Sequence, residues 1–470
     1  MLLILTLLSA LAQDPEPPVL MPPPPPVVVD LVLRNARLVD ADGERLGDVV
    51  IDDGRITQIL SPGEDLPYEA AETLDLTGMT VTPGLIDSHV HATFATGSGL
   101  FTWSDAQEDA LIQHSLRAYV AAGVTTVLDC ASVDADLARV NGYLQQGVGP
   151  RLLHLGEPPA QAGTYGPTVL PDLRVQDTPD ELGAHLRHLK QTGSIGVKVL
   201  FEDGLMRPVW DLPGGQWLDA LVAGAAAQEL PMYVHAMSPE ETAAALAIQP
   251  HALVHGLWAP DAEVAAAVAA QDPYVIATMH ISASSLYPAR PAWQSDPLRE
   301  LLVHPTIRAH QDDPEVRQEM ALAVGAIATP RMPAFLVKRL GASTKFAEGM
   351  LDDRMEATAQ LHDAGVKLVV GSDAPGWPVL IDNLPAWSTI RELELLHDAG
   401  LSPTEVLAAA TSVPAEMLGL ADELGRIRVG LAADLVVMTG DPLSDIGAWR
   451  TVTQVIRDGE LRTPEGWLTE

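Results

Sequence analysis

Short runs in which hydrophobic and polar residues alternate occupy both ends of the chain. Residues 29–83 contain the runs VDLVLRNARLVD, GDVVIDDGRITQIL and AETLDLTGMTVTP, and residues 424–470 contain further runs of the same kind. Alternation with a period of two is typical of strands with one buried face, and Gly and Asp between the runs favour turns. The pattern therefore predicts one small β-sandwich domain assembled from both chain ends.

The segment between these ends, residues 84–423, alternates short apolar runs with longer stretches rich in Ala and Leu. Strands that alternate with helices in this way indicate a parallel α/β fold. Eight such strands favour a (β/α)8 TIM barrel, in which the active site lies at the C-terminal ends of the strands. The eight predicted strands cover residues 84–91, 124–130, 150–156, 194–201, 231–237, 251–257, 274–280 and 366–373.

The connection between the last two predicted strands, residues 281–365, is much longer than the others. Long connections in compact folds are usually functional, so we expect a lid or a specificity element here. A later stretch, LSPTEVLAAAT, has Ser402 in the N-cap position, Pro403 at the first helical position and Glu405 in the capping-box position. It predicts a helix that begins after Ser402.

The beginning of the chain has the features of a leader. Leu2–Leu11 is apolar and is followed by a small-residue cleavage pattern, so residues 1–12 are predicted to be a signal peptide that is too short to span a bilayer. Residues 13–28 are proline-rich and predict an extended linker. Export to the periplasm or the medium is the expectation. A cytoplasmic protein stays open as the alternative, because no basic residue precedes Arg34 and the positive segment of a signal is missing.

The composition of the chain excludes several classes of binding partner and of functional site. The chain has 63 Asp and Glu against 28 Lys and Arg, a net charge of −35, which repels nucleic acid and anionic membranes. Its single cysteine, Cys130, excludes an internal disulfide and a multi-cysteine metal site. The chain has no phosphate-binding loop, nucleophile elbow or H-E-x-x-H motif. We therefore expect a small molecule or short peptide as substrate. The sequence does not fix the subunit number and leaves a homo-oligomer open.

Two histidines lie one residue apart at the end of the first predicted barrel strand, in the sequence GLIDSHVHATF. Residues i and i+2 of a strand point to the same face, so His89 and His91 both point into the barrel. A lone histidine in such a place is usually a hydrogen-bonded core residue. Neutral imidazole is also the commonest protein ligand for metals, and the other strand ends favour that second interpretation.

Four more polar residues lie at the ends of other predicted strands: Lys198, His235, His255 and Asp373. Burial of an unpaired ammonium is costly and lowers the pKa of a lysine such as Lys198 toward that of a neutral, nucleophilic amine. So many metal-binding groups at the same end of five strands predict a metal site. His251 lies four residues before His255, about 13 Å further down the strand, which is too far to bind the same metal, so it is predicted to be structural.

These motifs resemble those of the amidohydrolase superfamily over essentially the whole chain after the leader. The resemblance rests on PGLIDSHVH, GVKVL, YVHAM, LVHG, GSDAP and the C-terminal TSVPAEMLGL and GRIRVGLAADLVVM. It implies one divalent ion on His89, His91 and Asp373, and a second on His235 and His255. It also implies that Lys198 is carboxylated and bridges the two ions. Zinc is the expected metal, and manganese, iron and cobalt suit similar ligands.

The resemblance further implies hydrolysis of an amide or cyclic amide C–N bond, in a substrate such as a dipeptide or an N-acyl amino acid. Metal-activated hydroxide would attack the carbonyl, and Asp373 would act as general acid and base. Asp87, two residues before His89, is either an outer partner of that ligand or a packing residue. Three alternatives stay open: a mononuclear deaminase or imidazolone-type cyclic amidine hydrolase, a lactonase, and a metal-binding protein without catalysis.

Three further residues on the same side of the predicted barrel are candidate substrate contacts. Tyr165 lies in GEPPAQAGTYGP, which resembles the substrate loop of imidazolonepropionase-like members, while His280 and His154 lie near the ends of the seventh and third predicted strands. Each could equally be a surface or hydrogen-bonded residue. Arginines of the long connection could hold a substrate carboxylate, although most are expected to be solvated. They are Arg290, Arg308 and Arg331.

Overall fold

The computed structural model describes residues 28–469 except 65–68, 148, 170–172, 205–208, 287–289, 329–334, 336–343 and 377–379. The predicted signal peptide and all but the last residue of the predicted linker therefore lie outside the described residues, and so does Arg331. None of the helices in the described ranges combines the length and the apolar character needed to cross a membrane.

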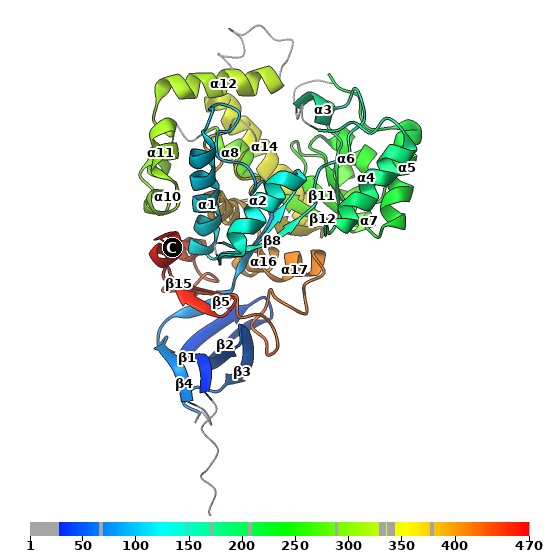
Figure 1. The fold of residues 1–470 in the computed structure, drawn as a ribbon. Coiled ribbons are helices and arrows are strands. Elements are labelled where there is room, and N and C mark those ends of the chain that lie inside the picture. The colour runs from blue at the N-terminus through cyan, green and yellow to red at the C-terminus, as the bar shows by residue number, and fades with distance from the viewer. Residues whose placement is uncertain are drawn as a thin grey trace, which may run out of the picture.

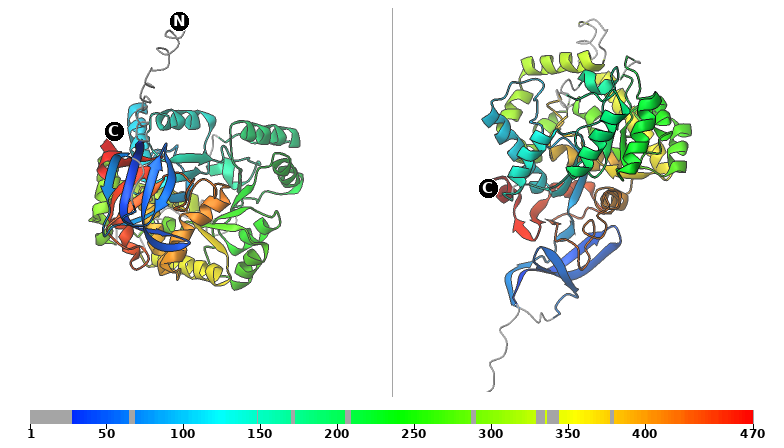
Figure 2. Two further views of the ribbon diagram at one scale, coloured as in Figure 1. Left: turned by 90° about the horizontal axis from the view of Figure 1, so that it is seen from below. Right: turned by 45° about the vertical axis from the view of Figure 1, so that its right-hand side comes forward.

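A sheet made from both ends of the chain lies at one end of the molecule, where the blue and red strands meet in Figures 1 and 2. Its order is β16-β15-β14-β5-β1-β2-β3, and β4 pairs with β1. The contribution of both termini is as predicted. The eight strands form one continuous sheet. They are β1 (Val28–Asp40), β2 (Gly43–Asp52), β3 (Arg55–Leu60), β4 (Glu69–Asp75), β5 (Thr80–Pro83), β14 (Leu435–Met438), β15 (Val452–Arg457) and β16 (Glu460–Arg462).

Alternate residues of this sheet form its core, as the period of two requires. Leu31 and Leu33 of β1 pack with Ile51 of β2 in one cluster that also includes Leu435. The sheet curls back on itself, because the Ile56 amide of β3 donates to the Leu431 carbonyl just before β14 at 2.9 Å. Residues as far apart in the sequence as Leu31 and Leu435 therefore share one hydrophobic core.

The middle of the chain contains all eight predicted parallel strands. Five form a sheet in the order β13-β12-β11-β10-β9, and three form a sheet in the order β6-β7-β8. They are β6 (Leu85–Val90), β7 (Val124–Asp129), β8 (Arg151–His154), β9 (Val197–Leu200), β10 (Met232–His235), β11 (Ala252–His255), β12 (Tyr274–Ala277) and β13 (Lys367–Val370).

Backbone hydrogen bonds join the two parallel sheets at both edges. The Asp373 amide after β13 donates to the His89 carbonyl of β6 at 2.7 Å, and the Ile195 amide before β9 donates to the His154 carbonyl of β8 at 3.1 Å. The strands thus form a ring that is consistent with the predicted (β/α)8 barrel.

Helices surround the strands, as Figure 2 shows. They are α1 (Asp105–Ala121), α2 (Asp134–Leu144), α3 (Tyr165–Val169), α4 (Pro179–Gln191), α5 (Gly215–Ala227), α6 (Pro239–Leu246), α7 (Ala262–Gln271), α8 (His280–Ser284), α9 (Pro291–Gln294), α10 (Pro297–Leu302), α11 (Pro305–Gln311), α12 (Pro314–Ala328), α14 (Thr344–Asp363), α15 (Trp387–Asp398), α16 (Pro403–Ala409), α17 (Ser412–Met417), the 3₁₀ helix η2 (Ile446–Arg450) and α18 (Pro464–Thr469).

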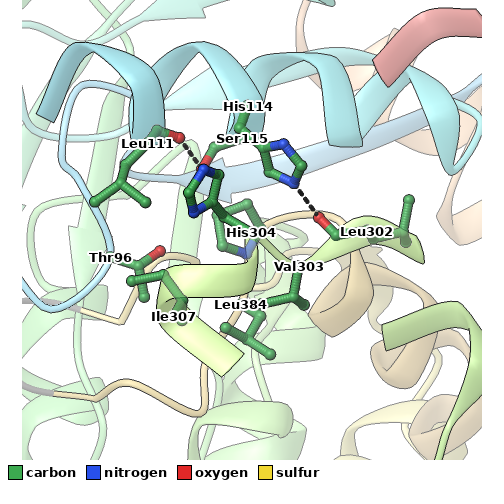
Figure 3. A pocket seen from close by; sticks show the side chains of 10 residues that line it. Thr96, Leu111, His114, Ser115, Leu302, Val303, His304, Ile307 and Leu384 are labelled. Atoms are coloured by element: carbon green, nitrogen blue, oxygen red, sulfur yellow. Dashed lines mark hydrogen bonds between the residues drawn. The ribbon is translucent and has the colours of Figure 1, made fainter. Parts of the chain in front are cut away.

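The long connection between β12 and β13 consists largely of helices, from α8 to α14. Its helices α10 and α11 pack against α1, where His114 points at the Leu302 carbonyl with its Nε2 at 2.9 Å (Figure 3). The connection is thus anchored to the helix that follows β6, the strand next to β13 in the ring. This anchoring places helical structure over the strand ends, where a specificity element would lie; its role as a lid stays a prediction.

The predicted capping box at the start of α16 is present. Ser402 Oγ accepts the Glu405 amide at 3.3 Å, and Glu405 Oε2 accepts the Ser402 amide at 2.8 Å. We expect Ser402→Ala to lower the free energy of unfolding by about 1 kcal/mol, because the Glu405 amide loses its acceptor and the Glu405 carboxylate loses the hydroxyl that donates to it. Chemical denaturation of both proteins measures the difference. An unchanged midpoint would show that the cap does not stabilise the folded protein.

Candidate metal centre

His89 of β6 and His91, directly after that strand, meet the aspartate that follows β13. His89 Nε2 lies 2.7 Å and His91 Nε2 lies 2.9 Å from the same oxygen, Oδ1 of Asp373. All three side chains are shielded, with His89 only 1% exposed. One ligand atom from each of the three lies within 4.8 Å of the others, a spacing that can hold a metal ion. The alternation of β6 brings these groups together, as the sequence predicted.

The electrostatics of this group suit a cation. Burial lowers the pKa of His89 to about 3, so its imidazole is neutral at pH 7 and keeps a lone pair for a metal. Burial by itself would raise the pKa of Asp373, but the neighbouring His89 and His91 hold it well below its usual range. Within the described part of the chain, neither histidine Nδ1 has a hydrogen-bond partner. The polar contacts of both rings are thus directed at one carboxylate, and the donor set fits a divalent ion.

A second pair of histidines lies beside the first. The ring centres of His235 and His255 are 4.4 Å apart, and His255 is 4.9 Å from His89. His255 Nδ1 contacts the Thr278 hydroxyl at 3.0 Å, which leaves its Nε2 available. Burial lowers the pKa of His235 to about 3 and that of His255 well below the usual value, so both rings are neutral. Two more nitrogen donors are therefore present at the same strand ends.

Lys198 is buried on β9, with 3% of its surface exposed. Among the described residues, none forms a hydrogen bond or an ion pair with its ammonium group, and burial lowers the pKa of Lys198. A charged ammonium is poorly accommodated there, whereas the neutral amine is the form that carbon dioxide can carboxylate. Burial of Lys198 therefore favours the neutral amine, and its carboxylation stays a prediction.

The loop that carries Asp373 is held from several sides. Asn383 Nδ2 donates to the Asp373 carbonyl at 2.7 Å, and the Tyr119 hydroxyl donates to the Ala374 carbonyl at 3.1 Å. Asp373 has a φ of 55° and His255 a φ of 81°, in the left-handed region that non-glycine residues rarely adopt. Such conformations cluster at functional sites, where the surrounding structure holds them in place.

Asp87 connects β6 to the same loop. Its carboxylate accepts the Ser372 amide at 3.0 Å and the Thr389 hydroxyl at 2.6 Å, and it lies 3.3 Å from the His89 amide. Burial raises the pKa of Asp87 to about 6, against these hydrogen bonds, which lower it. Asp87 thus holds the backbone next to two of the three residues, at His89 and at Ser372 before Asp373. Its contact with His89 is to the backbone amide and not to the ring.

The three candidate substrate residues take different positions. Tyr165 stacks on His235 with ring centres 5.8 Å apart and lies at the site. His280 is fully buried, with Nδ1 3.1 Å from Asn383 Oδ1, so it supports the Asp373 loop through that amide. His154 is not brought to the other histidines, because its neighbours along β8 point into the barrel and its ring lies by the Thr192 carbonyl at the end of α4.

Other predicted residues lie away from the centre. His251 Nε2 contacts the Met417 carbonyl at 2.9 Å, in agreement with a structural role. Arg308 forms an ion pair with Glu300, and the Arg290 guanidinium lies 5.9 Å from the ring centre of Trp293.

Two buried residues at the site were missed by the sequence reasoning. Glu202 Oε2 lies 3.2 Å from His235 Nε2, and burial raises the pKa of Glu202 to about 7. Arg354 of α14 donates to the carbonyls of His255 and Thr278, at 2.8 and 2.9 Å. An acidic residue just after a strand that carries a site lysine is a signal for Glu202. Arg354 comes from the long connection and carried no comparable signal.

Known proteins resemble this chain in sequence. An allantoinase of Desulfitobacterium hafniense strain Y51 is 44% identical over 62 residues, 13% of this chain and 13% of the allantoinase. The chain thus matches about an eighth of the length of that relative. The imidazolonepropionase of Sphingopyxis alaskensis is 24% identical over 461 residues, which cover 91% of this chain and 96% of that protein.

Solved structures share the fold. A Xaa-Pro dipeptidase with bound methionine in its active site has a TM-score of 0.70 at 20% identity, covering 92% of this chain and 99% of that one. The ochratoxinase of A. niger has a TM-score of 0.68 at 20% identity, covering 93% and 97%. The model of the amidohydrolase family matches residues 80–462, from the last strand before the first parallel sheet to β16. Since this match covers most of the sequence, the chain belongs to the amidohydrolase family.

Proposed function

We propose that this protein is a metal-dependent amidohydrolase that cleaves an amide or cyclic amide C–N bond. The observation that carries the proposal is the convergence of His89, His91 and Asp373 on one point, beside the pair His235 and His255. In this proposal the first three would hold one divalent ion, the pair would hold a second, and Lys198, once carboxylated, would supply oxygen ligands to both. Zinc suits this set of nitrogen and oxygen donors.

Each group of the proposed site has its own role in the reaction. Divalent ions, when bound, acidify a water molecule and polarise the substrate carbonyl. Asp373, ionised at neutral pH, would take a proton from the attacking water at its carboxylate and give it to the leaving nitrogen. The neutral rings of His89 and His235 offer lone pairs without adding positive charge. Burial of the whole group excludes bulk water, which strengthens each electrostatic contact.

Aromatic rings around the centre support a substrate with an apolar group. Phe94 stacks on His91 with ring centres 5.6 Å apart, and Tyr165 on His235 with a separation of 5.8 Å. Trp210 packs on Tyr165 at 5.1 Å. A dipeptide or an N-acyl amino acid with an apolar side chain could place that group against these rings. The dipeptidase and ochratoxinase structures, which share the fold, are compatible with this class.

A mononuclear enzyme is the second candidate. Among the described residues, only His89, His91 and Asp373 bring three donors within 4.8 Å of one another. One ion there would suit a deaminase or a cyclic amidine hydrolase, and the full-length similarity to an imidazolonepropionase supports that class.

A substrate panel tests the proposal. Zinc-loaded protein is assayed on Xaa-Pro dipeptides, N-acyl amino acids, cyclic amides, imidazolones and lactones, with a chelator-treated sample as the control. We expect turnover of an amide or cyclic amide that stops in the chelated sample and returns with zinc. Turnover of imidazolones or amidines alone would support the second candidate. Turnover of lactones alone, or none with full metal loading, would contradict amide hydrolysis.

A further inference from the structure

A buried glutamate contacts one of the two histidines of the second pair. Glu202 lies two residues beyond β9 and is only 2% exposed. Its Oε2 is 3.2 Å from His235 Nε2, and its Oε1 accepts the Gly204 amide at 2.8 Å. Both carboxylate oxygens therefore have a partner, and one of these partners is a site imidazole. A carboxylate is buried at such a position only when its hydrogen bonds compensate for the lost water.

This contact fixes which nitrogen of His235 is free. A carboxylate only accepts hydrogen bonds, so the proton of the neutral ring lies on Nε2 and the lone pair on Nδ1. In His255 the arrangement is reversed, because Thr278 occupies Nδ1 and leaves Nε2. The rings of His235 and His255 are nearly perpendicular, at 77°. Each ring thus has one nitrogen engaged by a neighbouring residue and one nitrogen left for a cation.

Glu202 does not complete a three-ligand group with this pair. In the part of the chain that the structure describes, the three-donor group within 4.8 Å is that of His89, His91 and Asp373. Glu202 instead contacts one ring nitrogen of His235, as the hydrogen-bond acceptors of metal-bound histidines do. Such outer carboxylates fix the tautomer and the ring orientation and raise the basicity of the ligand.

We propose that Glu202 is a positioning residue that holds His235 as the Nε2–H tautomer and so assigns Nδ1 as the ligand atom for the second metal ion. The inference rests on the proposed binuclear function. It adds a residue and a ligand atom to that site. Loss of Glu202 leaves the first metal group intact and weakens the second.

Metal titration of the purified apoprotein tests the metal side of this inference. Zinc affinities are measured for the wild type, Glu202→Ala, Glu202→Gln and the control Glu392→Gln. Glu392 is also fully buried, its pKa is also raised to about 7, and it accepts the amides of Met279 and His280 at 2.9 and 2.8 Å. We expect Glu202→Ala to weaken one of two sites by about 10- to 100-fold. Glu202→Gln, which keeps an acceptor oxygen, should weaken it less, and Glu392→Gln should not change it.

Nitrogen NMR of the apoprotein, labelled at histidine, tests the tautomer without any metal. The His235 signal, assigned with His235→Gln, should report Nε2–H in the wild type and lose that preference in Glu202→Ala. Equal second-site affinities in wild type and Glu202→Ala, or an Nδ1–H tautomer in the wild type, would overturn the inference. A wild type that binds one ion but shows the Glu202-dependent tautomer would overturn the binuclear function while retaining the role of Glu202 on His235.

Discussion

Asp373→Asn should lower kcat by at least about a thousandfold, or about 4 kcal/mol of transition-state stabilisation, on whichever substrate the panel identifies. Asparagine keeps the size of the side chain and one ligand oxygen. It cannot take a proton from water or give one to a leaving nitrogen, and it replaces the negatively charged oxygen that His89 and His91 contact by a neutral amide. Steady-state kinetics, with circular dichroism to verify folding, measure the effect.

Asp296→Asn is the matched control for this substitution. Asp296 is also a buried aspartate with two side-chain partners, Trp387 at 2.8 Å and Arg450 at 2.6 Å, but it contacts none of the four histidines. It should lose stability and keep kcat within about threefold, because its contacts are structural. A kcat for Asp373→Asn that matches the control would show that Asp373 neither moves a proton nor supports the reacting group.

Lys198→Ala should also lower kcat by at least about a thousandfold, because the proposed bridge between the ions is removed. Alanine leaves a cavity where the carboxylated side chain would lie. A small carboxylate such as acetate can enter that cavity and supply the missing oxygens. We expect acetate, and not methylamine, to restore part of the activity of Lys198→Ala. Kinetics at increasing acetate concentration, at constant ionic strength, measure the rescue.

Lys367→Ala is the control for the second prediction. Lys367 begins β13, its side chain is 41% exposed, and it pairs with Asp272 at 2.6 Å. This lysine lies at the other end of a barrel strand, so its loss should leave kcat and the acetate response unchanged. Rescue of Lys198→Ala by methylamine would indicate that the lysine acts as an amine, which would contradict the carboxylated form.

The positions of the strands and of most site residues were predictable because both depend on strand periodicity. The alternation in GLIDSHVH placed His89 and His91 on one face, and the structure shows both beside Asp373. Lys198, His235 and His255 were predicted from their positions at the ends of other strands. A parallel ring of strands brings all such ends together, so residues far apart in the sequence meet without any special signal between them.

Residues in loops were less predictable, because strand parity does not apply beyond the end of a strand. Glu202 lies two residues beyond β9, and its contact with His235 could not be inferred from the strand pattern. His154, in contrast, ends a strand but has the parity that points away from the interior. Asp87 was predicted to be either an outer partner of His89 or a packing residue. It is a hydrogen-bonded packing residue, and its contacts fix the backbone of the ligand loops.

The measurement that tests the account most directly is the metal content per chain, by elemental analysis of wild type and Lys198→Ala. Both proteins are purified with bicarbonate and without chelator. The account predicts two ions per chain in the wild type and one or none in the variant, because carboxylated Lys198 joins the two donor groups. A single ion in the wild type that the substitution does not change would contradict the binuclear centre.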